Sequence, residues 1–358
     1  MTNTAHSQAT RREAIRTAFI LGALAPVLHV APALASDADT DFILGTVNPE
    51  LRLVAAQLLT RFYPSLGADN LAIARNRPLL PEGAPLKVAV QKRVIPGAKG
   101  QPDVTIYVIN ARPPGSKRPA LLHTHGGGYI LGTARDAAQN LQDICLALDC
   151  PAVSVDYRLA PETTYKGSVE DNYAGLKWLH DHAHELGADR ERIAVVGESA
   201  GGGHAALLAI AARDRGEIPL AFQCLIYPML DDRTGTSRKI PPHMGRMIWN
   251  AQSNRFGWGS FLGMEPGGPD VPSAAVPARL NDLKGLPPAF IGVGSIDLFL
   301  DEDVDYAQRL IAANVPAELL VVPGGFHGFD VLAPQSRLTR QFAAAKIDAL
   351  RAGLGLSA

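Results

Sequence analysis

Ser199 lies in the pentapeptide Gly-Glu-Ser-Ala-Gly at 197–201, the spacing of a nucleophile elbow. The apolar run 192–196 before it predicts a buried strand, and the Ala- and Leu-rich run 202–213 after it predicts a helix. A sharp turn between them lifts the hydroxyl to where a substrate and a base can reach it, and the flanking glycines leave room for the turn. The first amides of the helix favour developing negative charge. The pentapeptide alone could arise by chance in a glycine-rich chain, but its flanking elements favour a functional role.

Two later loops offer the base and the orienting acid that a serine nucleophile needs. Asp297 follows the apolar run 289–294, and His327 follows the apolar run 317–322. Because both runs predict parallel strands, their carboxyl ends are expected at one edge of the sheet, where open α/β sheets place their sites. Of the 10 histidines, His327 alone follows the acid-bearing strand. We therefore expect Ser199, Asp297 and His327 to form a catalytic triad.

Asp301, Glu302 and Asp303 are alternative acids for the same role. They lie at the start of the next predicted helix, where carboxylates commonly cap the helix or offset its dipole. Asp297 is nearer to the end of the strand, and we therefore expect it to orient the histidine.

The run His125, Gly126, Gly127 and Gly128 follows another predicted strand and could supply oxyanion donors. Glycines let main-chain amides approach a ligand closely, and such a loop acts together with the amide that follows the nucleophile, here Ala200. A plain glycine-rich turn or a phosphate cradle are the alternatives. A phosphate loop would require a Lys-Ser/Thr pair or the G-x-G-x-x-G spacing, and neither is present here.

Strands alternate with helices along most of the chain, which predicts an α/β fold with a mostly parallel sheet covered by helices on both faces. The runs 87–94 and 103–109, separated by a turn-like stretch, predict an opening hairpin. The later expected strands are 119–125, 152–157, 192–196, 222–228, 289–294 and 317–322. The expected helices between and after them are 134–148, 169–184, 202–213, 303–313 and 335–352.

Two segments fall outside this alternation. Residues 36–86 contain apolar residues at helical spacing followed by several prolines. Residues 231–276 are rich in Gly, Pro, Trp and Met, include Trp249, and contain no predicted strand. We interpret the two segments as parts of a helical cap, the second being an insertion that covers the site. The core is then expected at 87–230 and 277–358.

The length, composition and charge are those expected of a folded, soluble chain. The 358 residues are 47% hydrophobic and 19% charged, with a formal net charge of −1. The absence of a long basic block argues against nucleic acid or an anionic membrane as the main partner. The 3 cysteines have neither zinc nor redox spacing, and Cys145 and Cys224 lie in apolar runs where burial is expected.

The N-terminus has the organisation of a signal peptide. Arg11 and Arg12 precede an apolar run at 18–30, and small residues at Ala33 and Ala35 suit cleavage after Ala35. The paired arginines indicate the twin-arginine route, although the residues after them are Glu and Ala rather than an apolar pair. A membrane anchor or an N-terminal helix is the alternative, but the run is short for a span. We expect residues 1–35 to be removed and the protein to be periplasmic or secreted.

Four motifs in order make the chain resemble the hormone-sensitive-lipase-like α/β-hydrolases, the bacterial family IV esterases. They are His-Gly-Gly-Gly at 125–128, Asp-Tyr-Arg-Leu-Ala-Pro-Glu at 156–162, Gly-Glu-Ser-Ala-Gly-Gly at 197–202 and His-Gly-Phe at 327–329. The similarity runs from about residue 48 to the C-terminus, and the combination of motifs is highly specific.

The resemblance implies an α/β-hydrolase fold with the triad named above and with oxyanion amides from Gly127, Gly128 and Ala200. It also implies a supporting role for six neighbours: His125, Gly126, Asp156, Tyr157, Arg158 and Glu198. Three positions depart from the family pattern. Glu198 stands where many relatives have Asp, Tyr129 stands where Phe is commoner, and no proline follows Asp297.

The chemistry expected is that of a serine carboxylesterase acting on short-chain or small-molecule esters, with neither a cofactor nor a metal. Other acyl substrates remain open, namely those of an amidase, a lactonase or a polysaccharide deacetylase, because the cap decides specificity. A non-catalytic binding protein on the same fold is a further alternative. Expected partners are a small ester, no nucleic acid, no stable membrane insertion after signal cleavage, and a second copy in a homodimer.

Overall fold

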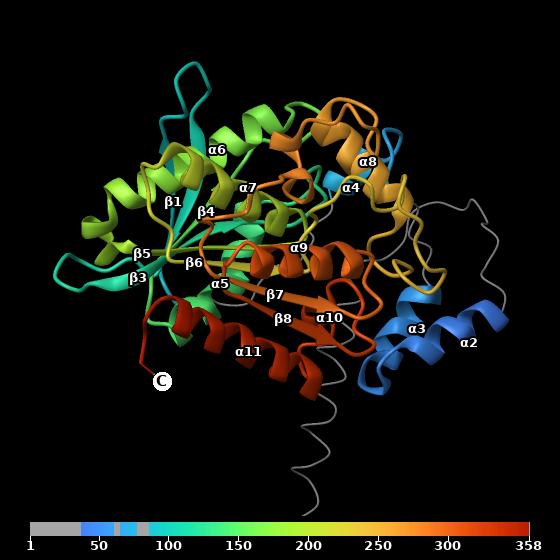
Figure 1. The fold of residues 1–358 in the computed structure, drawn as a ribbon. Helices are drawn as coiled ribbons and strands as arrows, with labels where there is room; N and C mark the ends of the chain where they lie inside the picture. The colour runs from blue at the N-terminus through green and yellow to red at the C-terminus, as the bar shows by residue number, and fades with distance from the viewer. Residues whose placement is uncertain (1–36, 61–64, 77–85, 358) are drawn as a thin grey trace, which may run out of the picture.

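A single twisted sheet runs through the molecule in the computed structural model, which describes residues 37–60, 65–76 and 86–357 (Figure 1). The strands are β1 (Val90–Ile95), β2 (Val104–Ile109), β3 (Arg118–Thr124), β4 (Ala152–Asp156), β5 (Ala188–Glu198), β6 (Phe222–Ile226), β7 (Ala289–Gly294) and β8 (Ala317–Val322). They lie in the order β1-β2-β4-β3-β5-β6-β7-β8. The pairs β1–β2 and β2–β4 are antiparallel, and the others are parallel. The mostly parallel sheet predicted from the alternation is therefore confirmed.

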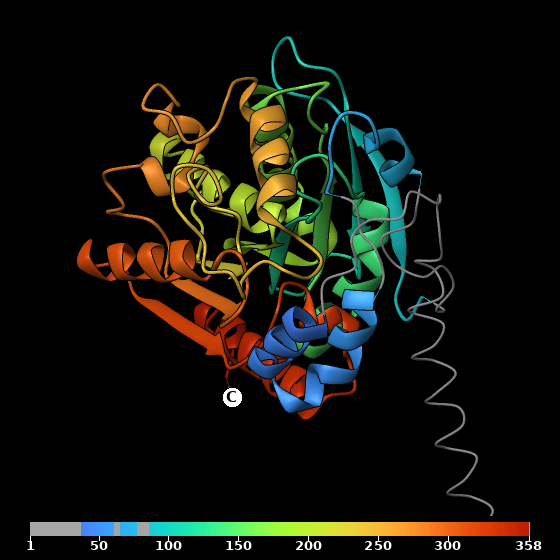
Figure 2. The ribbon, with the colours of Figure 1, turned by 90° about the vertical axis from the view of Figure 1, so that its right-hand side faces the viewer.

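Helices cover both faces of this sheet, as Figures 1 and 2 show. In chain order they are α2 (Asp37–Thr46), α3 (Arg52–Thr60), α4 (Leu71–Arg75), α5 (Ala134–Ala147), α6 (Tyr165–Asp181), α7 (Ala200–Arg215), α8 (Ala251–Leu262), α9 (Leu300–Ala312), α10 (Phe329–Leu332) and α11 (Arg337–Gly353). Short 3-10 turns lie at Pro49–Leu51, Ala183–Leu186, Ser273–Ala275 and Pro277–Arg279. Helices α5 and α11 pack on one face with one apolar cluster, and α6, α7 and α9 pack on the other. Every residue of β3 is buried, as expected for a strand with both faces covered.

Most expected elements are present with shifted ends. The strand before the serine begins at Ala188, earlier than predicted, and the following helix begins at Ala200. Helix α2 was not predicted, and α8 lies in the 231–276 insertion, where the structure has no strand, as predicted. Cys145, Cys150 and Cys224 are buried and unpaired. Among the described helices, none has both the length and the apolar character needed to cross a bilayer.

The predicted signal peptide at 1–35 lies outside the described residues, so export and cleavage stay predictions. The homodimer stays a prediction as well.

The N-terminal segment contacts the sheet at the carboxyl ends of its strands. Helices α2 and α3, blue in Figures 1 and 2, lie beside the last strands of the sheet. Asn48 donates its main-chain N–H to Gly324 O at 3.1 Å and its side-chain amide to Pro323 O at 3.0 Å. Gly324 has φ +66°, and a Cβ there would lie 2.2 Å from Asn48 N. The segment therefore fixes the loop that leads to His327.

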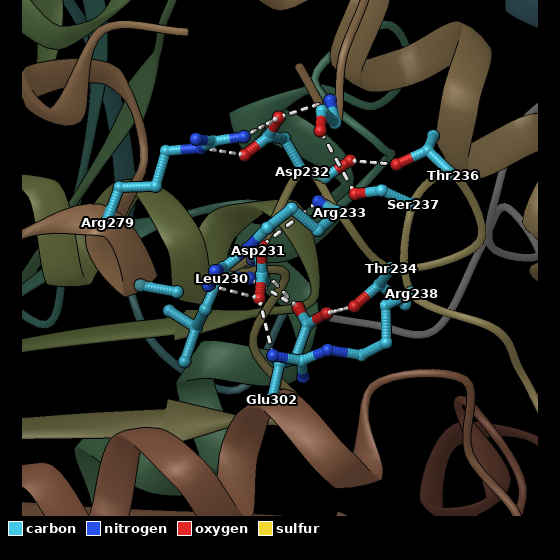
Figure 3. A network of polar contacts seen from close by, with 12 residues as sticks. Leu230, Asp231, Asp232, Arg233, Thr234, Thr236, Ser237, Arg238, Arg279 and Glu302 are labelled. Atoms are coloured by element: carbon cyan, nitrogen blue, oxygen red, sulfur yellow. Dashed lines mark hydrogen bonds and ion pairs between the residues drawn. The ribbon is translucent and has the colours of Figure 1, made fainter. Parts of the chain in front are cut away.

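A buried ion-pair network fixes the start of the 231–276 insertion (Figure 3). Asp231 and Asp232 are fully buried. Asp231 pairs with Arg233 at 2.7 Å and with Arg238 at 2.9 Å, while Asp232 pairs with Arg279 at 2.5 Å. Since a buried carboxylate without a partner is strongly destabilising, these arginines are required where the chain leaves the core.

Glu302 joins this network from α9. Its Oε1 accepts hydrogen bonds from the main-chain N–H groups of Leu230 at 2.6 Å and Asp231 at 3.2 Å, and Thr234 Oγ1 donates to its Oε2. Glu302 and Asp303 lie in the first turn of α9, as expected, but both are buried, and Glu302 binds the neighbouring loop rather than N–H groups of its own helix. A carboxylate three residues into an amphipathic helix lies on its buried face when the neighbouring loop offers donors.

Burial raises the pKa of the Glu302 carboxyl well above its usual range, and the negative charge of Asp231 raises it further. A folded-state pKa above the unfolded value means that the folded chain retains a proton that the unfolded chain has released. This contribution to stability is full below about pH 4.3, the ordinary pKa of glutamate, and is lost as the pH rises toward the folded-state pKa.

We expect Glu302→Gln, which has similar shape and no charge, to remove this pH dependence. The unfolding free energy of the native chain should therefore fall relative to Glu302→Gln as pH rises above about 4.3. Glu302→Ala should lose roughly 2–4 kcal/mol, because it leaves a cavity and unpaired main-chain N–H groups. Urea denaturation between pH 4 and 8 measures both; a constant difference between the native chain and Glu302→Gln across that range would contradict the assignment.

Candidate active site

Ser199 occupies a strained turn between β5 and α7. Its φ is +58° and its ψ −124°, values that a residue with a side chain rarely adopts. Its N–H donates to Ile226 O at 2.9 Å, and its carbonyl accepts from Gly203 N at 3.1 Å and Met229 N at 2.9 Å. These main-chain hydrogen bonds hold the turn in place and direct the serine side chain out of the sheet.

Glycines make this turn possible. A Cβ on Gly197 would lie 2.3 Å from Gly201 O, and a Cβ on Gly201 would lie 2.1 Å from Thr124 O. Main chain therefore packs directly on main chain on both sides of Ser199. This is the physical reason for the G-x-S-x-G spacing that the sequence shows.

The structure brings Ser199, His327 and Asp297 into one hydrogen-bonded chain. His327 Nε2 lies 3.0 Å from Ser199 Oγ, and His327 Nδ1 lies 2.9 Å from Asp297 Oδ2. Asp297 Oδ1 accepts a hydrogen bond from Phe299 N at 3.0 Å, which fixes the carboxylate. All three side chains are buried, and the ring of Tyr227 lies 4.7 Å from that of His327.

Aspartate 297, and none of the three alternative acids, contacts the imidazole. Asp301 is exposed in the first turn of α9, and Glu302 accepts hydrogen bonds in the ion-pair network described above. Asp303 is buried, and no hydrogen-bond partner is found for its carboxyl within the described residues. Burial raises the pKa of this carboxyl well above its usual range, and the charge of Glu302 raises it further.

The glycine loop after β3 passes beside the serine. A Cβ on Gly126 would lie 3.5 Å from Ser199 Cβ, so the loop passes against the nucleophile. Gly127 and Gly128 have φ +127° and +61°, which only glycine adopts readily. Ala200 is the first residue of α7, where N–H groups have no intrahelical partner. Within the described residues, no protein acceptor binds the N–H of Gly127, Gly128 or Ala200.

His125 and Tyr157 hold this loop in position. Their rings stack with centroids 4.2 Å apart, and Tyr157 Oη donates to His125 O at 2.6 Å. His125 Nδ1 lies 2.9 Å from Gly126 O. Burial lowers the pKa of His125 to about 4, so the ring is neutral near pH 7 and its Nδ1–H can donate to that carbonyl.

Asp156 and Arg158 act further from the serine. Asp156 Oδ1 accepts from Ala134 N at 2.8 Å, at the start of α5. Arg158 binds both oxygens of the buried Asp171 on α6, each at 2.8 Å. Both contacts fix the chain after β4, which fits the supporting role that the motif implied.

Glu198 forms a contact that sequence reasoning missed. Its Oε2 lies 2.9 Å from His123 Nε2, and His123 Nδ1 lies 2.9 Å from Ser154 Oγ. Burial alone would raise the pKa of Glu198, but the neighbouring His123 brings that pKa below its usual value. A histidine inside an otherwise apolar strand was the available signal, because a buried polar side chain requires a partner.

Trp249 is a second residue whose role the sequence did not indicate. It lies in the insertion and contacts the glycine loop at Gly128.

In the part of the chain that the structure describes, no group of three or more His, Cys, Asp or Glu side chains could hold a metal ion.

Comparison with known proteins places these features in a family. A profile of the alpha/beta hydrolase fold matches residues 121–331, which include all three members of the hydrogen-bonded chain. Carboxylesterase NlhH of Mycobacterium tuberculosis is 34% identical over 301 residues, which are 79% of this chain and 89% of that protein. Esterase LipI of the same species is 35% identical over 237 residues, covering 66% of this chain and 73% of LipI.

Solved structures of esterases have the same fold. A bacterial heroin esterase superposes with a TM-score of 0.77 at 35% identity, over 87% of this chain and 99% of that one. Esterase LipW of Mycobacterium marinum superposes with a TM-score of 0.72 at 33% identity, over 87% of this chain and 96% of LipW. With the fold, the motifs and the relatives in agreement, the chain belongs to the hormone-sensitive-lipase-like branch of the α/β-hydrolase family.

Proposed function

We propose that this protein is a serine carboxylesterase that hydrolyses esters with short or compact acyl groups through an acyl-serine intermediate. The observation that carries the proposal is the hydrogen-bonded chain from Ser199 Oγ through His327 to Asp297, at 3.0 and 2.9 Å. The relatives named above, a carboxylesterase and a heroin esterase among them, support an ester as the substrate.

Each member of the chain has a distinct task in the first half of the reaction. His327 Nε2 takes the proton from Ser199 Oγ as that oxygen attacks the carbonyl carbon of the ester. Asp297 accepts the Nδ1–H, which fixes the tautomer with a free Nε2 and stabilises the imidazolium that forms. His327 then donates its proton to the departing alkoxide, and an acyl group remains on Ser199.

Formation and hydrolysis of the acyl-serine each pass through a tetrahedral intermediate in which the former carbonyl oxygen is negatively charged. Stabilising this charge lowers the free energy of both intermediates. Within the described residues, the N–H groups of Gly127, Gly128 and Ala200 have no protein acceptor; they belong to the loop that passes Ser199 and to the residue after it, so they are the donors available to that oxygen. Because these donors are fixed before the substrate arrives, little reorganisation accompanies the reaction, and one such donor is typically worth ~10²–10³ in kcat. Water activated by His327 then releases the acid and restores Ser199.

Ser199→Ala should lower kcat for p-nitrophenyl acetate by about 10⁴–10⁶-fold, because residual catalysis comes only from the oxyanion donors and binding. The far-UV circular dichroism of the variant should match that of the native chain. Ser357→Ala, at an exposed serine after the last helix, is the matched control and should leave kcat unchanged. Retention of more than a tenth of native activity in Ser199→Ala would refute the nucleophile assignment.

Asp297→Asn and Asp301→Asn test the acid in the same assay. An asparagine at 297 can donate its amide to Nδ1 and so favours the imidazole tautomer with the proton on Nε2, which cannot act as a base; kcat should fall by about 10⁴-fold. Asp301 is exposed and does not contact His327, so Asp301→Asn should stay within threefold of native activity. The reverse order of effects would assign the acid to Asp301.

A further inference from the structure

The 231–276 insertion places an indole directly on the oxyanion loop. A Cβ on Gly128 would lie 2.0 Å from Cη2 and 2.5 Å from Cζ2 of Trp249, so the ring packs against the Gly128 Cα. On α8, a Cβ on Gly257 would lie 2.7 Å from Gly128 O and 3.3 Å from Trp249 Cζ2. Two glycines from different parts of the chain therefore leave room for one large side chain beside the oxyanion donors.

The indole is fixed in this position. Trp249 Nε1 donates to Asn254 Oδ1 at 3.0 Å, and Asn254 Nδ2 donates to Thr234 O at 2.8 Å. Thr234 in turn donates its hydroxyl to Glu302, within the network of Figure 3. Hydrogen bonds therefore connect the ring to the core helix α9.

A strained turn presents the ring to the loop. Ile248 has φ +66°, and Trp249 N donates to Met247 O at 2.8 Å. This is a γ-turn with a positive central φ, the rare and strained form, and here its central residue is β-branched and 40% exposed. The side chain of Ile248 is only partly buried, and the strain persists because the surroundings of the turn hold it, as is common at functional sites.

The same segment also contacts the other side of the site. Gly245 N donates to Ile296 O at 3.3 Å, next to Asp297, and a Cβ on Gly245 would lie 2.7 Å from Leu298 Cδ1. Residues 245–249 therefore run from the loop of the acid to the oxyanion loop. The Trp249 ring packs against Gly128, one of the expected oxyanion donors, so a carbonyl group bound by that loop lies beside this segment.

We propose that Trp249 is the specificity-determining residue that limits the acyl group to short chains, with its ring forming the wall of the acyl site beside Gly128. This rests on the esterase function proposed above. Once the indole is removed, the space it leaves can accept further methylenes, and each buried methylene is worth roughly fourfold in transition-state binding. Longer esters then become better substrates relative to acetate.

Trp249→Ala tests this through the chain-length profile. We would measure kcat/KM for p-nitrophenyl acetate, butyrate, hexanoate and octanoate on the native chain and on Trp249→Ala. The octanoate-to-acetate ratio should rise at least tenfold in the variant, while Trp249→Phe should keep it within threefold. Trp178→Ala, at a half-buried tryptophan on α6 that stacks on His182, is the matched control and should leave the ratio unchanged.

The outcomes separate this proposal from the one on which it rests. An equal loss on all four esters in Trp249→Ala would mean that the ring only positions the glycine loop, and it would overturn the proposal. A native chain inactive on every ester would instead contradict the esterase function. If Trp249→Ala does not fold, Trp249→Leu keeps apolar contacts with a smaller side chain. A smaller rise in the octanoate-to-acetate ratio, at least threefold, is then expected, and an unchanged ratio would overturn the proposal.

Discussion

The active site depends on main chain packing directly against main chain around Ser199. A side chain on Gly197 or Gly201 would overlap carbonyl groups within 2.3 Å, and a Cβ on Gly202 or Gly203 would lie 2.7 or 2.2 Å from its nearest neighbour. Because positions 197 and 201 are both glycine, the single residue Ser199 can connect β5 to α7. The positive φ of Ser199 costs of order 1–3 kcal/mol, and the hydrogen bonds to Ile226, Gly203 and Met229 hold it.

The two segments expected to form the cap bind the loops of the site. Asn48 fixes the loop before His327, Arg75 on α4 donates to Ile130 O in the loop that carries the oxyanion glycines, and Gly245 binds beside Asp297. Each loop of the site is therefore bound by a segment that lies far from it in sequence. Changes in the cap are expected to alter catalysis itself as well as substrate choice, since small displacements of reacting groups have large effects on rate.

Much of this arrangement was predictable because it depends on local chemistry. The strands of the sheet are apolar runs with turn residues between them, and the elbow has a spacing that main-chain crowding requires. Asp297 was distinguishable from Asp301 because the end of a strand and the start of a helix place side chains differently. The order β2-β4-β3-β5 in the sheet was not predictable. Both β3 and β4 are apolar runs, and their residues do not indicate which strands they pair with.

The parts that sequence reasoning missed depend on contacts between distant segments. Glu302 resembles a helix-capping carboxylate until the main chain at Leu230 and Asp231 is seen to donate to it. Trp249 is one aromatic among several in the insertion, and only the crowding at Gly128 distinguishes it. No residue type marks Ile248 for a positive φ; a β-branched residue is among the least expected there.

The central claim is that Ser199 carries the acyl group during turnover, and mass spectrometry can observe that group directly. The native chain would be mixed with p-nitrophenyl acetate, quenched with acid within milliseconds to seconds, digested and analysed peptide by peptide. One acetyl group is expected on the peptide containing Ser199, accumulating within the first turnover and disappearing once substrate is exhausted. Hydrolysis with no acetylated peptide at any quench time, or with the acetyl group on another residue, would contradict it.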